Sequence, residues 1–102
     1  MSINEDAPPP AVGVYWIEEA DYPALRGLFE DGNKMPATWK EWLKMAEEMK
    51  RGLESYGHPV IRVRIDPQIF SDWCAAQGTG PSREARNRFV AAAVKERYGD
   101  QN

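Results

Sequence analysis

Only two short segments of this 102-residue chain have the residue pattern of a β-strand, and this restricts the fold more than any other feature. Residues 12–17 are rich in β-branched and aromatic residues, and residues 60–65 alternate apolar residues with arginine. An extended segment needs hydrogen-bonding partners for its backbone groups. The simplest expectation is that the two segments pair within the chain, and pairing of 60–65 with its copy in a second molecule is the alternative.

Capping signals place helices between and after these strands. Thr38 followed by Glu41 has the spacing of a capping box, and Asp66 and Ser82 are favourable N-cap residues. Gly78 is a stop signal between the last two helices. The expected helices are 19–30, 38–56, 67–77 and 82–98. The sequence therefore predicts an α+β fold in the order βααβαα.

One domain is expected over residues 12–98, with the helices packed on one face of the strand pair. Residues 1–11, which contain three consecutive prolines, have the composition of a disordered leader, and 99–102 that of a frayed tail. The apolar face of 67–77 is expected to include Ile69. The expected core comprises Tyr22, Leu25, Trp42, Leu43, Ala46, Met49, Phe70, Trp73, Phe89 and Ala93.

Composition excludes several classes of protein. No apolar run approaches the roughly 20 residues that cross a bilayer, and the acidic start has no apolar signal segment. Thirteen basic and sixteen acidic residues give a net charge of −3. One cysteine and one histidine exclude a disulfide framework and the usual zinc site. We expect a cytoplasmic protein without contact to a membrane.

Residues with catalytic potential lack the neighbours that catalysis requires. Cys74 lies in an apolar stretch without a base at a suitable spacing, and His58 lies in a turn between glycine and proline. The glycines do not form a phosphate-binding loop. We therefore expect no catalytic, cofactor-binding or metal-binding residue, and the protein is not expected to be an enzyme.

The second half of the chain carries the clearest candidate for a binding site. Arg62 and Arg64 share one face of a predicted strand, and Ser82 and Arg83 open a predicted helix. This strand–helix–helix segment resembles a ribbon-helix-helix DNA-binding domain, in which strands of two chains pair antiparallel. The resemblance implies that Arg62 and Arg64 read base edges and that Ser82 and Arg83 hold a phosphate. Residues 59–98 carry seven basic and four acidic residues, a net charge of +3.

Pairing within the chain suggests a different function. One face of the two-stranded ribbon then carries Val12, Val14, Trp16, Val60, Arg62 and Arg64. Such a half-apolar face is typical of a surface that binds a protein or mediates self-association. The alternatives are that a helix or the leader covers its apolar half, and that the arginines only solvate the ribbon with their stems over Trp16. The interaction domain is the leading hypothesis, and DNA binding is the rival.

The direction of strand pairing distinguishes two origins of the fold. Shifting the chain by 48 residues aligns residue classes at four positions, including Ile17 with Ile65 and Tyr22 with Phe70. A true repeat implies antiparallel strands that imitate a ribbon-helix-helix dimer within one molecule. Ordinary helical crossovers imply parallel strands.

A second resemblance spans most of 12–98. The stretches 14–17, 21–23, 38–43 and 66–74 are similar to a group of short, uncharacterised bacterial proteins. That resemblance implies a compact cytoplasmic domain and no particular activity.

Overall fold

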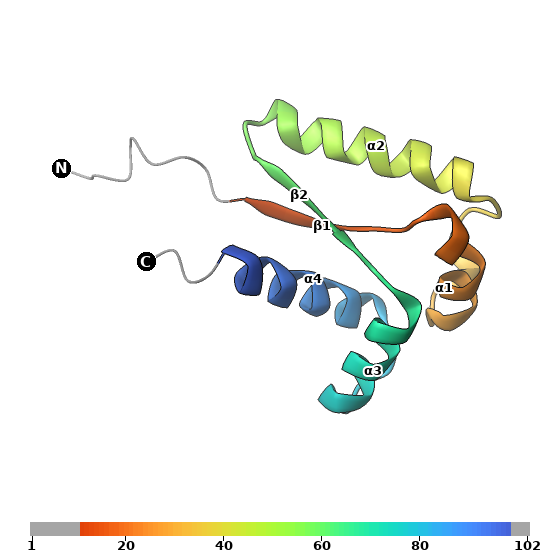
Figure 1. The fold of residues 1–102 in the computed structure, drawn as a ribbon. Coiled ribbons are helices and arrows are strands. Elements are labelled where there is room, and N and C mark those ends of the chain that lie inside the picture. Colours follow the sequence, from red (N-terminus) through yellow and green to blue (C-terminus); the bar gives the residue numbers. More distant parts are fainter. Residues whose placement is uncertain (1–10, 99–102) are drawn as a thin grey trace.

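The computed structural model describes residues 11–98 (Figure 1). The predicted α+β class and the βααβαα order are confirmed. The expected helix 19–30 is divided into a 3-10 turn and a shorter α-helix, because Pro23 fits only within a first turn. The predictions for 1–10 and 99–102 lie outside the described residues. The elements are β1 (Val12–Trp16), η2 (Glu19–Asp21), α1 (Tyr22–Leu28), η3 (Gly32–Lys34), α2 (Trp39–Ser55), β2 (Val60–Arg64), α3 (Pro67–Gln77) and α4 (Arg83–Tyr98).

The helix boundaries follow from the predicted caps. The Thr38 hydroxyl accepts a hydrogen bond from the backbone N–H of Glu41 at 3.2 Å. A carboxylate oxygen of Asp66 accepts two backbone N–H groups at the start of α3, at 2.9 and 3.0 Å. Gly78 ends α3 with a φ of 68°, a left-handed conformation that suits glycine. These local signals therefore act as the sequence predicts.

Strands β1 and β2 pair with each other in parallel, with Val12 opposite Val60 and Trp16 opposite Arg64. Pairing within the chain is therefore confirmed. Parallel strands require a crossover, which α1 and α2 provide. The idea of an antiparallel ribbon-helix-helix dimer imitated within one molecule is wrong for this reason.

The helices cover both faces of the ribbon, so the expectation that they pack on one face is wrong. In Figure 1, α2 lies on one side of the strands and α4 on the other. Trp16 contacts Trp42 of α2, with ring centroids 5.5 Å apart. A Cβ atom on Gly13 would lie 2.6 Å from Val94 and 2.7 Å from Val90, both on α4. Glycine at this position therefore lets α4 approach the strand closely.

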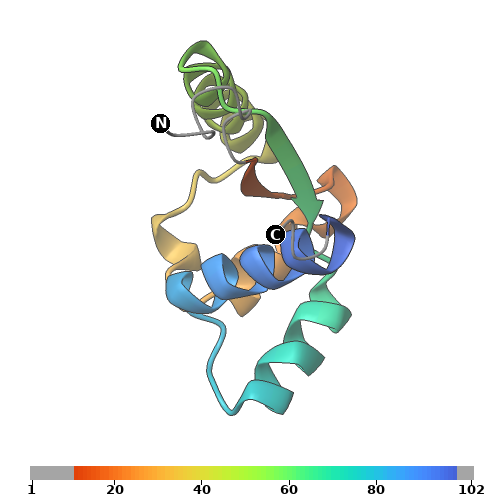
Figure 2. The same cartoon turned by 90° about the vertical axis from the view of Figure 1, so that its left-hand side faces the viewer.

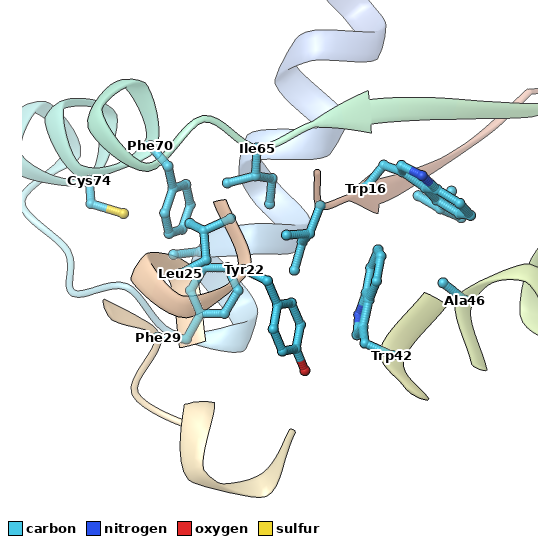
Figure 3. Packing of buried hydrophobic residues seen from close by; sticks show 12 residues of the cluster. Trp16, Tyr22, Leu25, Phe29, Trp42, Ala46, Ile65, Phe70 and Cys74 are labelled. Atoms are coloured by element: carbon cyan, nitrogen blue, oxygen red, sulfur yellow. The ribbon is translucent and has the colours of Figure 1, made fainter. Parts of the chain in front are cut away.

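The core extends from the ribbon to α1, α2 and α3 (Figure 3). Ile17, Leu25, Ile65 and Phe70 are fully buried. Two core predictions are wrong, because Met49 is 50% exposed and Ile69 is 60% exposed. Of the helices in residues 11–98, none combines the length and the apolar character that crossing a membrane requires.

Candidate functional site

The structure gathers four of the six predicted contact residues on one face of the ribbon. Val14 is opposite Arg62, and Trp16 is opposite Arg64. Val14 is only 6% exposed and Trp16 only 8%, because α2 covers them. The apolar half of the predicted ribbon face is therefore part of the core and is not an exposed patch. This outcome corresponds to the alternative in which a helix covers it.

The two arginines of β2 remain exposed but already have intramolecular partners. The guanidinium of Arg62 lies 5.2 Å from the ring centroid of Trp16, which is a cation–π contact. Arg64 donates two hydrogen bonds to one carboxylate oxygen of Asp21, at 2.8 and 3.2 Å. A DNA contact by Arg64 would have to compete with Asp21.

Ser82 and Arg83 have different positions at the start of α4. The Ser82 hydroxyl accepts a hydrogen bond from the backbone N–H of Ala85 at 3.1 Å, so it caps the helix. Arg83 is exposed and lines a groove on the far side of β1 from β2. The structure therefore separates Arg83 from the arginines of β2.

This groove has a volume of about 1130 Å³ and lies between α2 and α4. Strand β1 forms its floor, and Lys34, Met35 and Pro36 in and after η3 also line it. Ala11 and residues 12–15 of β1 all contribute to its lining. Ligand pockets for small molecules usually measure about 300–1000 Å³. The groove is therefore slightly larger than this range, and its lining follows β1 from Val12 to Tyr15.

The walls of the groove are mainly apolar. Met45 and Met49 project from α2 and are 59% and 50% exposed. Val90, Ala91 and Val94 line it from α4. Methionine side chains are flexible and polarisable, and they are common at surfaces that bind varied partners. The groove is therefore an exposed apolar surface of the kind that marks an interaction site.

The floor of the groove is the unpaired edge of β1. On the β2 side, the backbone N–H of Val12 donates a hydrogen bond to the carbonyl oxygen of Pro59 at 2.9 Å. The carbonyl oxygen of Trp16 accepts one from the backbone N–H of Ile65 at 3.0 Å. Because backbone groups alternate in direction along a strand, Gly13 and Tyr15 turn theirs away from β2. Within residues 11–98, no other backbone group forms a hydrogen bond with the N–H or C=O groups of Gly13 and Tyr15.

Two tryptophans, Trp39 and Trp42, lie at the C-terminal end of this open edge. The edge ends at Ile17, whose carbonyl accepts a hydrogen bond from Trp39 Nε1 at 2.9 Å. Trp42 lines the groove beside Tyr15, with ring centroids 6.2 Å apart. The accessible part of the edge therefore extends from the start of β1 to Tyr15.

A partly buried ion pair lies at the Tyr15 end of the groove, and sequence reasoning missed it. Arg86 is only 3% exposed, and its two terminal nitrogens donate to the two carboxylate oxygens of Asp31 at 2.8 and 3.0 Å. The guanidinium lies 4.4 Å from the ring centroid of Phe29 and 5.1 Å from that of Tyr15. The pair ties α4 to the segment that follows α1.

The ion pair shifts the pKa of both partners. Hydrogen bonds from Arg86 hold the pKa of Asp31 below its ordinary value. Burial acts to lower the pKa of Arg86, but the hydrogen bond to Asp31 and the neighbouring Tyr15 outweigh it, and that pKa is raised. Both groups are therefore charged at neutral pH.

The remaining charges around the groove are basic. Lys34, Arg83 and Lys95 are exposed and line it, and Asp31 is the acidic residue of the lining. Because Asp31 neutralises Arg86, the groove keeps three uncompensated positive charges. The whole chain carries a net charge of −3, so this basic character is local.

Two further features concern the described part of the chain, its metal-ligating side chains and its cysteine. No group of three or more metal-ligating side chains is close enough to hold an ion among residues 11–98. Cys74 is buried, and burial raises the pKa of its thiol, which keeps the thiol protonated. The groove has the chemistry of a binding surface.

Comparison of the chain with family models, with curated proteins and with solved structures gave no match. The resemblances noted from the sequence therefore stay predictions.

Proposed function

We propose that this protein is a non-catalytic interaction domain that binds a polypeptide segment of another protein. The proposal depends on one observation, the long apolar groove in which Met45 and Met49 are exposed beside an unpaired strand edge. Exposed apolar surface of this kind is typical of protein-binding sites. The ribbon face that carries Val14 and Trp16 is covered and is not part of the proposed binding site.

Selection from a random library of linear peptides, with the full-length chain as bait, tests the proposal. Wild-type protein should enrich peptides that bind it in solution. Substituting both groove methionines, Met45→Glu and Met49→Glu, should weaken that binding at least tenfold, because charge replaces apolar surface in the groove. Ile69→Glu is the matched control, since Ile69 is an equally exposed apolar residue on α3 outside the groove.

The outcomes separate this function from its rival. Binding that survives the double methionine substitution, or a selection without enrichment, would refute the groove as a protein-binding site. Titration of labelled duplex DNA at low and moderate salt addresses the rival. A salt-sensitive complex that the Arg62→Ala/Arg64→Ala variant loses would favour DNA recognition by β2.

A further inference from the structure

We infer that the occupant of the groove is an extended segment of a partner protein that adds to β1 as a third strand and carries a carboxylate near each end. This inference rests on the proposed function and specifies the partner. It combines the open edge of β1 with the charges and apolar residues around it.

The open edge supplies the backbone contacts. Gly13 and Tyr15 each direct one N–H and one C=O into the groove, which gives four groups for a new ladder. A segment of about five residues, at about 3.3 Å per residue, covers residues 11–15. Strand addition to an exposed edge is a common mode of peptide recognition, because main-chain hydrogen bonds do not depend on the partner's sequence.

The two helices specify the side chains of the added strand. Alternate residues of a strand point to opposite faces. One set meets Met45 and Met49 on α2, and the other meets Ala91 and Val94 on α4. Apolar side chains therefore suit the middle of the segment on both faces.

The ends of the segment meet basic residues. Arg86 lies beside Tyr15, and Val94 lies beside Gly13, so α4 runs antiparallel to β1. Arg83 therefore stands near the end of β1 and Lys95 near its start. They are twelve residues apart on one helix, which is about 18 Å at 1.5 Å per residue. A five- to six-residue strand spans this distance and can place one carboxylate against each charge.

A second copy of the chain does not fit this site. The open edge lies between α2 and α4, and a second copy would bring its own flanking helices against them (Figure 2). A single extended segment avoids that clash. The chain's own residues 1–10 include Glu5 and Asp6, but a return along β1 requires a reversal near Pro8, Pro9 and Pro10, where proline favours extended backbone.

Two synthetic heptapeptide mixtures test the inference on the full-length chain. Both have Val, Ile or Leu at positions two, four and six and Val at three and five. One mixture ends in Glu at both ends, and the other ends in Lys. The Glu-ended mixture should bind at least tenfold more tightly at low salt, and this preference should shrink as salt rises. Equal affinity, or preference for Lys ends, would overturn the carboxylate assignment.

Backbone N-methylation tests strand addition separately from charge. Methylating the amides of one alternate set in the Glu-ended peptide should weaken binding at least tenfold, whereas methylating the other set should change affinity less than threefold. Amide exchange of Gly13 and Tyr15 should slow at least tenfold on binding, while that of Val14 stays unchanged. Equal sensitivity of both sets, or unchanged exchange at Gly13 and Tyr15, would refute strand addition.

The proposed function and this inference fail in different ways. The function fails if the random library yields no peptide that depends on Met45 and Met49. The inference alone fails if such peptides exist but bind as helices, prefer basic ends, or leave Gly13 and Tyr15 unprotected. Protection of both amides in the dilute, peptide-free chain would assign the edge to residues 1–10 and overturn the inference.

Discussion

Replacing Asp31 with alanine should destabilise the domain, because it leaves the Arg86 guanidinium buried without its counter-ion. Arg86 is 3% exposed, and its guanidinium packs against the rings of Phe29 and Tyr15. Removing one partner of a fully buried ion pair costs about 3–5 kcal/mol, against about 0–1 kcal/mol for an exposed pair. The Asp31 side chain is 31% exposed, so water reaches the site. We expect a loss of about 2–3 kcal/mol, between these limits.

Urea and thermal unfolding, followed by far-UV circular dichroism, measure this loss. For a domain of this size, 1 kcal/mol corresponds to about 4–8 °C in Tm, so Asp31→Ala should lower Tm by roughly 10–20 °C. Glu48→Ala on the exposed side of α2 is the control and should stay within about 0.5 kcal/mol of wild type.

A double-mutant cycle identifies the ion pair as the cause. Arg86→Met removes the buried charge and keeps an apolar side chain between Tyr15 and Phe29. The Asp31→Ala/Arg86→Met variant should therefore be less destabilised than the sum of its single variants, with a coupling energy of about 1–3 kcal/mol. A loss below about 0.5 kcal/mol for Asp31→Ala, or additive losses in the double variant, would refute this reasoning.

Three further predictions concern the contact of Gly13 with α4, the cap of α3 at Asp66, and the pH dependence of the stabilisation by Asp31. Gly13→Ala should cost about 1–3 kcal/mol in urea unfolding, because the new methyl group overlaps Val90 and Val94, and Val90→Ala should restore part of the loss; an unchanged free energy would contradict the close approach of α4. Asp66→Ala should cost about 1 kcal/mol through loss of the α3 cap, and Asp66→Asn should recover most of it; equal losses in both variants would contradict capping. The pKa of Asp31 is lowered in the folded state, so its stabilisation is complete above its unfolded-state pKa near 3.8 and is lost as pH falls through the lower folded-state pKa. The difference in unfolding free energy between wild type and Asp31→Asn should therefore shrink from about pH 5 to about pH 2, and a constant difference would contradict the assignment.

Signals that act over a few residues predicted much of this fold. The caps at Thr38, Asp66 and Ser82 each satisfy backbone groups within the next three residues, so the sequence around them is sufficient. The alternation of β2 likewise placed Arg62 and Arg64 on one face.

The sequence of residues 12–17 contains a signal for helices on both faces of the strand, although the alternation of its residues predicted one exposed face. Residues 12–17 are apolar on both alternate sets, which is typical of a parallel strand covered on both sides. We interpreted one set as a surface, although α2 buries both Val14 and Trp16. The absence of a polar set in 12–17 thus indicated the parallel arrangement.

The groove itself could not be predicted from neighbouring residues. Arg86 and Asp31 are 55 positions apart, and nothing near either residue in the sequence indicates their pairing. Met49 belongs to the apolar stripe of α2, but a ribbon of two strands is too narrow to cover the whole stripe of a 17-residue helix. The part of the stripe that extends past β1 became the exposed wall of the groove.

Amide hydrogen exchange of β1 in the peptide-free, full-length chain is the most direct test of the central claim that this strand has an open edge. An open edge predicts an alternating pattern, with slow exchange at Val14 and Trp16, which donate to β2, and exchange at least tenfold faster at Gly13 and Tyr15. Uniformly slow exchange along the strand would show that its second edge is already paired, and would contradict the account.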